Sequence, residues 1–345
     1  HELPAVHISQ SDGQLLKDWL AAGSGHMGTI GGAVESISDA NADILAGFSS
    51  RGPNSAVDMV IPSISAPGVD IIAAHGTDGD IVWDFLSGTS MASPHIAGSA
   101  ALLMALNPTW TPAEVQSAMM LTAAHTVLKE DGVTPGTPFD RGNGRIDLHA
   151  AANSGLVMSE TIDGYLDANP ATGGDVGAIN LASMANSACV LSCSWTRTVT
   201  ATTTASWTAA GIGHDGLVVT VSPENFALVE GESQEITITA DVTDVAAGGH
   251  VFGYLVLEAA GSTAGAGVPA ATMPIAVQAT TGDIPESVHI WTRRDAGSWL
   301  VEGLTALEIT DLTVEVDGLT IGEQDEAAIP GDSDNGDVFD DVTDG

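Results

Sequence analysis

Positive charge is what this sequence has least of. Its 345 residues include 8 Lys and Arg against 45 Asp and Glu, which gives a net charge of −37. Such a chain would repel nucleic-acid phosphates and anionic membrane surfaces, so we expect it to bind neither. An acidic excess favours solubility and suits salty media, where self-repulsion is screened. We interpret it as a surface trait of a secreted or salt-adapted protein, although drift without a functional cause would give the same composition.

Long apolar runs are also missing. The most apolar unbroken stretch is IAGSAALLMAL (96–106), about half of what a bilayer requires. Pro94 and His95 precede it and Asn107 follows it. We therefore predict a buried core helix here and no membrane span. Hydrophobic residues make up 44% of the chain, which is enough to form the packed cores of two or three domains.

Cysteine occurs only at Cys189 and Cys193, in CVLSC. No second Cys or His cluster lies nearby, so a metal site is disfavoured. A local disulfide is favoured over free thiols, and it would imply an oxidising compartment. The Asp residues of the tail (331–345) do not fit the D-x-[DN]-x-[DN]-G spacing of a calcium loop. A structural calcium ion therefore has no support, we expect no required cofactor, and we interpret the tail as a solvated acidic linker.

The first half of the chain reads as α/β. Residues 44–86 contain short strand-like runs broken by turns. A helix is predicted from Ser90 to about Ala105, and its Ala- and Leu-rich character on all faces predicts a central, enclosed position. A second helix is predicted from TPAE (111–114) to about Ala124, because this motif offers a Thr cap, a Pro at the first helical position and a Glu that completes a capping box.

The two ends of the chain have different patterns. After Gly155, apolar and polar residues alternate at period two between Gly, Asn and Pro turns, which predicts an antiparallel β-sandwich of roughly 120 residues. Residues 281–330 are typical of the start of a further β unit. At the other end, AVHIS (5–9) predicts a strand, and the helix that follows could be capped by Ser11 or Asp12.

The segment that carries chemistry is GTSMASPHIAG (88–98). A helix N-terminus offers unpaired N–H groups and positive potential, which would stabilise the oxyanion formed when the Ser90 hydroxyl attacks a carbonyl. Gly88 would let the backbone approach a substrate closely, Thr89 could help orient the oxyanion site and Met91 could line it. The plain alternatives are an N-cap for Ser90, a turn residue for Thr89 and core packing for Met91.

Two further residues near this motif could have a catalytic role, but we predict a structural role for both. His95 follows Ser90 by five residues on the same helix, so its ring would point away from the Ser90 hydroxyl. We therefore predict that it is structural and not the catalytic base. Arg51 is predicted to anchor its loop through an ion pair, because carboxylates are abundant in this chain.

GTSMASPHIAG resembles the nucleophile motif of the subtilisin-like serine proteases, the subtilases. Neighbouring segments resemble that family in order and spacing: FSSRGPN (48–54) and ISAPGVDIIAA (64–74) before the motif, LNPTWTPAEVQSAMMLTA (106–123) and GNGRIDLHAA (142–151) after it. The resemblance implies the C-terminal half of an α/β subtilisin-like catalytic domain. NLASMANSACVLSCSWTRTVT (180–200) resembles part of the all-β fibronectin-III-like sandwich that follows such domains.

The flanks resemble the subgroup that carries a protease-associated domain inserted before the FSSRGPN region. The domain organisation implied by the resemblance is: the end of that insert (1–22), the C-terminal half of the catalytic domain (23–155), the fibronectin-III-like sandwich (156–280), the start of a further β unit (281–330) and the acidic tail (331–345).

The family's chain order is Asp, His, Ser. None of the ten histidines lies in a GHGT-type motif, so we expect the Asp, the His and the oxyanion Asn to precede residue 1. The resemblance then implies a secreted endopeptidase that cleaves protein or peptide substrates through an acyl-enzyme on Ser90, with this portion inactive alone. The alternative is an inactive pseudoprotease or a β-sandwich adhesion protein. A serine esterase is disfavoured, because it would carry G-x-S-x-G.

Overall fold

The computed structural model describes residues 8, 10–31, 42–54, 56–76, 79, 81–260 and 267–282. The chain separates into two compact units, residues 1–42 and 43–345, which are considered individually. No helix in the described part of the chain is both long and apolar enough to cross a membrane.

In the described part of the first unit there is one helix, α1 (Gln10–Ala21). Ser11 and Asp12 lie inside its first turn, so the expectation that one of them caps the helix is wrong. Apolar side chains on this helix remain exposed, including Trp19 and Leu20. The strand predicted over residues 5–9 falls almost entirely outside the described residues.

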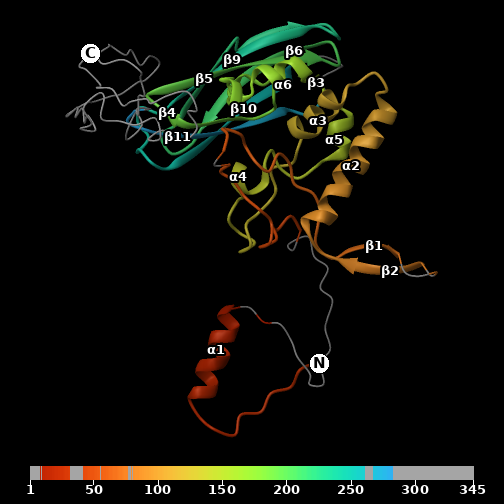
Figure 1. Ribbon diagram of the computed structural model, residues 1–345, viewed down its shortest axis with the longest axis vertical. Coiled ribbons are helices and arrows are strands. Elements are labelled where there is room, and N and C mark those ends of the chain that lie inside the picture. The colour runs from red at the N-terminus through yellow and green to blue at the C-terminus, as the bar shows by residue number, and fades with distance from the viewer. Residues whose placement is uncertain are drawn as a thin grey trace, which may run out of the picture. The chain divides into compact units, whose positions relative to one another are not determined.

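Residues 156–279 of the second unit form a two-sheet β-sandwich, as the alternating sequence pattern predicts (Figure 1). One sheet has the strand order β4-β11-β10-β6-β8, and the other has β3-β5-β9-β7. The strands are β3 (Leu156–Val157), β4 (Met184–Cys189), β5 (Ser192–Ala201), β6 (Ala205–Gly213), β7 (Val218–Ser222), β8 (Asn225–Leu228), β9 (Ser233–Asp241), β10 (His250–Ala260) and β11 (Ala271–Ala279).

The pairing of β4 with β11 is parallel, whereas the other named pairs in the two sheets are antiparallel. These two strands lie at opposite ends of the domain sequence, so no tight turn has to join them. Between β3 and β4 the chain forms α6 (Ile162–Asp167) and the 3₁₀ turns η2 (Pro170–Thr172) and η3 (Val176–Ala178). Trp207, Leu255 and Met273 are among the fully buried side chains between the sheets.

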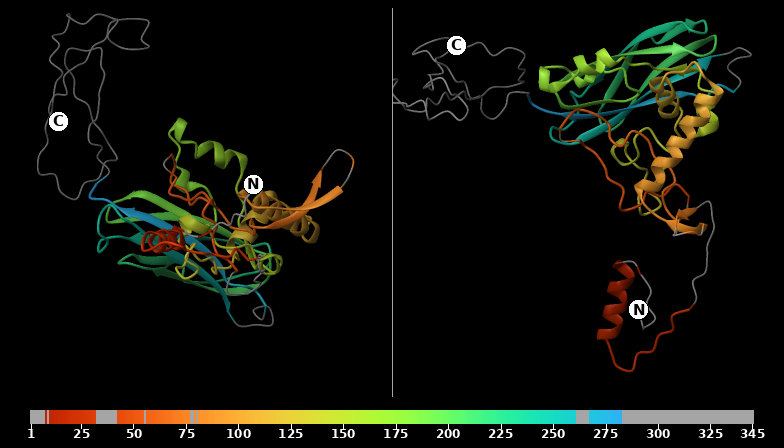
Figure 2. Two further views of the ribbon diagram at one scale, coloured as in Figure 1. Left: turned by 90° about the horizontal axis from the view of Figure 1, so that it is seen from below. Right: turned by 45° about the vertical axis from the view of Figure 1, so that its right-hand side comes forward.

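The remainder of this unit carries the motif of interest. It contains the antiparallel hairpin β1 (Ile71–Gly76) and β2 (Ile81–Leu86) and the helices α2 (Thr89–Leu106), α3 (Pro112–Leu121), α4 (Pro138–Arg141) and α5 (Leu148–Ala152). Figures 1 and 2 show the hairpin projecting at the end of α2 that lies away from the sandwich.

The predicted start of α3 is confirmed. The Thr111 hydroxyl accepts a hydrogen bond from the Glu114 amide at 3.2 Å, and the Glu114 carboxylate accepts one from the Thr111 amide at 2.7 Å. Pro112 takes the first helical position, where no intrahelical N–H bond is lost. The helix ends at Leu121, three residues before the expected end.

The expectation that α2 is enclosed is not met among the described residues. Only Leu103 is buried on this helix. It packs with residues of α3 and α5 such as Val115 and Ala151. Leu102 is 55% exposed and Leu106 is 66% exposed. The helix is apolar all round, as its composition indicates, but the described chain covers one side of it.

The strand-like runs predicted over residues 44–66 form isolated bridges in place of strands. Their backbone groups pair one at a time with a later loop region. The Leu45 amide donates to the Leu128 carbonyl, and the Ser65 amide donates to the Gly144 carbonyl, each at 2.8 Å. Single bridges of this kind do not extend into a ladder, so the only described ladder before α2 is the β1–β2 hairpin.

Candidate active site

Ser90 lies in the first turn of α2, and its side chain is exposed. The chain leaves β2, passes through Ser87 and Gly88, and enters the helix at Thr89. The Gly88 carbonyl accepts from the Met91 amide at 3.0 Å, which starts the helix. The Thr89 and Ser90 amides precede the first amide that donates within the helix, that of Met91, so they point out of the helix start without an intrahelical partner. An accessible hydroxyl and outward amides therefore occur together at this helix N-terminus.

The atoms around Gly88 leave room for a side chain, so they do not require a glycine at this position. A Cβ built there would meet only the Met91 sulfur at 3.5 Å and the Ser90 nitrogen at 3.7 Å, which are ordinary contacts. Its φ of 163° is extended backbone that any residue can adopt. Next to it, Gly68 is sterically constrained, because a Cβ there would lie 2.8 Å from the Gly88 carbonyl oxygen. Sequence reasoning missed Gly68, although it ends the APG motif that precedes β1.

His95 has the structural role predicted for it. Its Nδ1 lies 2.9 Å from the Met91 carbonyl oxygen on the same helix. In the described part of the chain, no hydrogen bond joins the Ser90 hydroxyl to an imidazole or a carboxylate. Met91 is half-buried and Thr89 is exposed. The described residues therefore place a nucleophile candidate without a base beside it.

The loop before β1 is held by the ion pair predicted for Arg51. One guanidinium nitrogen lies 3.0 Å from an Asp140 oxygen, and the other contacts Glu130. Lys129 also approaches Asp140, at 3.5 Å. Burial alone would raise the pKa of Asp140, but hydrogen bonds from Thr137 and the charges of Lys129 and Arg51 hold that pKa below its ordinary value. The carboxylate is thus ionised and anchors the loop.

The sandwich is joined to the Ser90-bearing part through buried polar contacts. Arg141 is 4% exposed and forms no ion pair with a carboxylate among the described residues. It donates to the Gly136 and Asn143 carbonyls and, at 3.0 Å, to the Tyr254 hydroxyl of β10. The Asn143 amide donates to the Ala182 carbonyl at 2.9 Å. Met120 and Leu121 of α3 belong to the same buried cluster as the sandwich core. The two parts are therefore packed as one body.

The sulfur atoms of Cys189 and Cys193 are joined in a disulfide, with 5.5 Å between the Cα atoms. Cys189 ends β4 and Cys193 lies in β5, and these consecutive strands belong to different sheets. Leu191, between them, has a φ of 57°, as expected for a tight reversal. The bridge therefore fixes the point where the chain crosses from one sheet to the other.

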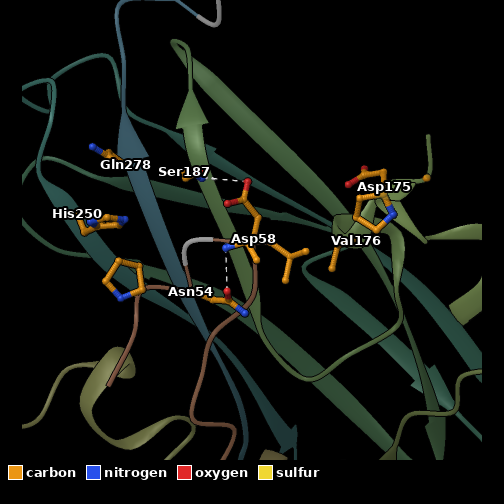
Figure 3. Close-up of a pocket in the computed structure, with 12 residues that line it drawn as sticks. Asn54, Asp58, Asp175, Val176, Ser187, His250 and Gln278 are labelled. Carbon is orange, nitrogen blue, oxygen red and sulfur yellow. Dashed lines mark hydrogen bonds between the residues drawn. The ribbon is translucent and has the colours of Figure 1, made fainter. Parts of the chain in front are cut away.

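A surface pocket of about 490 Å³ lies elsewhere, where residues 53–58 meet the sandwich (Figure 3). Asp58, Asp175 and His250 face it, and the Asp58 carboxylate accepts from the Ser187 amide at 3.1 Å. Burial lowers the pKa of His250, although Asp58 acts in the opposite direction. The lining contains no residue of α2 and no positively charged Lys or Arg. It is separate from the Ser90 site.

Comparison with known proteins agrees with this division of the chain. The profile of the Subtilase family matches residues 14–144, and that of the fibronectin type-III domain matches residues 178–277. The chain thus contains part of a subtilase peptidase domain followed by a fibronectin type-III-like domain. The match to the subtilase profile begins inside the segment that the sequence resemblance assigned to a protease-associated insert.

Curated relatives are plant proteases. Subtilisin-like protease SBT4.13 of Arabidopsis thaliana is 39% identical over 166 residues, which cover 46% of this chain and 22% of the relative. Subtilisin-like protease SBT1.7 of the same plant is 35% identical over 191 residues, which cover 48% of this chain and 24% of the relative. The chain thus spans about a quarter or less of the length of these proteins.

Proposed function

We propose that this chain is the nucleophile-bearing portion of a secreted subtilisin-like serine endopeptidase, which hydrolyses peptide bonds in protein or peptide substrates. The observation that carries the proposal is the exposed Ser90 in the first turn of the long helix α2, inside a segment that matches the Subtilase family. The catalytic His and Asp, and the Asn of the oxyanion site, would come from polypeptide that precedes residue 1.

In this proposal the Ser90 oxygen attacks the peptide carbonyl carbon while its proton passes to the His. The resulting oxyanion accepts hydrogen bonds from the Ser90 amide and the Asn side chain. The C–N bond then breaks, and the His returns the proton to the leaving amine. Water hydrolyses the Ser90 ester by the same route in reverse. Thr89 and Met91 flank the nucleophile and support the site.

Exposed apolar side chains on α2 and on the β1–β2 hairpin support the need for more polypeptide. Leu102 and Leu106 of α2 are more than half exposed, and so are Ile72, Trp83 and Phe85 of the hairpin. Ile72 pairs with Phe85, and Trp83 pairs with Ala74, so these side chains share one face of the hairpin. Apolar surface of this extent on a water-soluble part is typical of an interface. We assign it to the half of the peptidase domain that carries the His and the Asp.

Export and the finer domain boundaries are part of the same proposal. The Cys189–Cys193 disulfide is typical of proteins from oxidising compartments. We assign residues 1–22 to the end of a protease-associated insert, 23–155 to the peptidase domain and 156–280 to the fibronectin-III-like domain. The rival role of the sandwich as an independent adhesion module is disfavoured, because α3 of the peptidase part contributes to the sandwich core.

The test joins this chain to the upstream half of its own peptidase domain and measures cleavage of a fluorogenic peptide library. The joined protein should cleave peptides, and Ser90→Ala should reduce kcat by at least about 10⁴-fold with an unchanged circular dichroism spectrum. Ser194→Ala, an exposed serine on β5, is the matched control and should retain full activity. Full activity in Ser90→Ala would refute the assignment of the nucleophile.

The chain alone provides a second arm of that test. Without a base to remove the Ser90 proton, it should not react stoichiometrically with a fluorophosphonate probe. Rapid labelling at Ser90 would show that a base from within this chain is in place, and it would contradict the division of the catalytic residues proposed above.

A further inference from the structure

The hairpin that precedes Ser90 is closed at its base by a side chain. The last ladder pair is Ile71 with Leu86. One step further, the Asp70 amide donates to the Ser87 hydroxyl oxygen at 2.8 Å, where a ladder would use a backbone carbonyl. The same hydroxyl donates to the Asp70 carboxylate at 3.2 Å. Ser87 and Asp70 therefore hold each other in both directions.

The pairing continues beyond this point with an offset. The Gly88 amide donates to the Gly68 carbonyl at 2.8 Å, so residues 68–70 lie opposite residues 87 and 88. Three residues against two is the count of a β-bulge, which bends its strand and changes the direction of the side chains that follow. Asp70 has a φ of 50°, a left-handed conformation that Asp and Asn tolerate better than most residues.

This bulge is in direct contact with the start of α2. A Cβ at Gly68 would lie 2.8 Å from the Gly88 carbonyl oxygen and 3.3 Å from the Ala92 Cβ. The Gly88 carbonyl is also the acceptor that begins the helix, two residues before Ser90. Movement of the bulge would therefore move the first helical turn, which carries both the hydroxyl and the amide of Ser90.

We propose that Asp70 and Ser87 are positioning residues that fix Ser90 for acyl transfer. The inference rests on the function proposed above and deepens it. No hydrogen bond joins either residue to Ser90 in the described part of the chain; each acts through Gly88 and the first turn of α2. Loss of the Ser87 hydroxyl would remove the hydrogen bonds to both the Asp70 amide and the Asp70 carboxylate. The bulge would then lose the side-chain contacts that fix it, while the β1–β2 ladder would stay in place.

The first test requires no activity. Hydrogen–deuterium exchange of this chain should show faster exchange of the amides at Gly88 and Met91 in Ser87→Ala, with unchanged exchange along β1 and β2. Ser87→Thr keeps the hydroxyl and should restore slow exchange. Asp84→Asn is the matched control, because Asp84 lies in the same hairpin and, among the described residues, its carboxylate accepts from the adjacent Phe85 amide alone. Unchanged exchange in Ser87→Ala overturns the proposal.

The second test uses the complete peptidase, with this chain joined to its upstream half. Ser87→Ala and Asp70→Ala should lower kcat and the rate of fluorophosphonate labelling roughly 10- to 100-fold, with KM within about twofold, since a small displacement of a nucleophile lowers reactivity more than binding. Asp70→Asn keeps an acceptor oxygen and tolerates the left-handed conformation, so it should rescue most of kcat.

The outcomes separate the two proposals. Normal kcat in Ser87→Ala, with Ser90→Ala inactive, overturns the positioning role and leaves the proposed function standing. A rise in KM with unchanged kcat also overturns it, because this result would place the pair in substrate binding. Activity in Ser90→Ala refutes the proposed function, and the exchange measurement then still decides whether the pair orders the turn.

Discussion

The sandwich and the Ser90-bearing part differ in how completely each buries its apolar side chains. In the sandwich, alternate residues of both sheets meet in one continuous core, and Leu255, Leu257, Met273 and Ile275 are fully buried. Beneath α2 the buried cluster is small, and the opposite side of that helix is exposed. The sandwich buries its apolar side chains within the described chain, whereas the Ser90-bearing part leaves one side of α2 exposed, where the interface is proposed.

The largest expected effect on the free energy of unfolding comes from substitutions that create a cavity in each part. Leu255→Ala should lower the free energy of unfolding by about 2–5 kcal/mol, because Leu255 is fully buried between the sheets. Leu103→Ala should fall at the lower end of that range, since the thin cluster around it can collapse. Leu102→Ala, its exposed neighbour on α2, should change stability by less than about 0.5 kcal/mol.

Urea denaturation of the chain measures these three differences. In the complete peptidase the same Leu102→Ala change should cost about 2 kcal/mol or more, because the upstream half would bury that side chain. An equally small effect in both proteins would show that this side of α2 stays exposed, and it would remove the main support for an interface there.

The next effect tests how firmly the two parts are joined. Asn143 is fully buried and donates to the Ala182 and Thr272 carbonyls, at 2.9 and 3.4 Å. Asn143→Ala leaves these buried carbonyls with fewer donors and should cost about 1–3 kcal/mol in thermal or urea unfolding. Asn153→Ala removes an exposed amide that bonds within its own helix and should have little effect. Equal effects would show that the junction contributes little stability.

A smaller effect is expected for the disulfide. Cys189 and Cys193 are four residues apart, so the bridge removes little loop entropy from the unfolded chain. The chain-entropy relation gives at most about 2 kcal/mol. Reduction should therefore lower the melting temperature by a few degrees without unfolding the sandwich. Non-reducing mass spectrometry checks the bridge itself, and two free thiols in exported material would contradict both the bridge and the compartment inferred from it.

The smallest effect is a pH dependence at the junction. Burial, with the charge of Arg141, lowers the pKa of His125 from 6.5 to about 4. The unfolded chain takes up a proton near pH 6.5 and the folded chain near pH 4, so the contribution to stability is complete above pH 6.5 and is lost as the pH falls towards 4. Because the side chain is partly exposed, we expect about 1 kcal/mol.

Melting temperatures between pH 7 and 4 measure this dependence, and His125→Gln should flatten the part of the curve that it causes. Three neighbours define the environment of the imidazole: the Thr272 hydroxyl at 3.1 Å, the Tyr254 ring at 5.1 Å and the Arg141 guanidinium. An identical pH profile in the variant would show that other groups set the acid sensitivity.

Local signals in the sequence predicted their features well. The four residues of the capping box of α3 are consecutive in the sequence, so the motif could be recognised locally. The alternation after Gly155 reflects the burial of one face of each sandwich strand. The start of α2 was predicted at Ser90, one residue after its observed start at Thr89. The position of His95 could be predicted because both the imidazole and its acceptor, the Met91 carbonyl, lie on one helix.

Features that depend on distant residues could not be predicted. Whether α2 is enclosed depends on which other segments pack against it. The composition of the helix does not identify those segments. The need for glycine at residue 68 arises from the Gly88 carbonyl, 20 positions along the chain. The runs over residues 44–66 have the composition of strands, but their partners are loops that no local pattern identifies. The role of Arg141 likewise depends on Tyr254, 113 residues away.

The join between α3 and β11 also sets an order of events during synthesis. The Thr272 hydroxyl contacts the Leu121 carbonyl across 151 residues, and β11 is the last strand described. At about 5–20 residues per second, the ribosome needs roughly 10–30 s after α3 is made before β11 can reach it. Until then the apolar end of α3 has no complete core to enter, and contacts of such long range form slowly. The packing of the α3 end thus cannot be completed before the domain that follows it has been synthesised through β11.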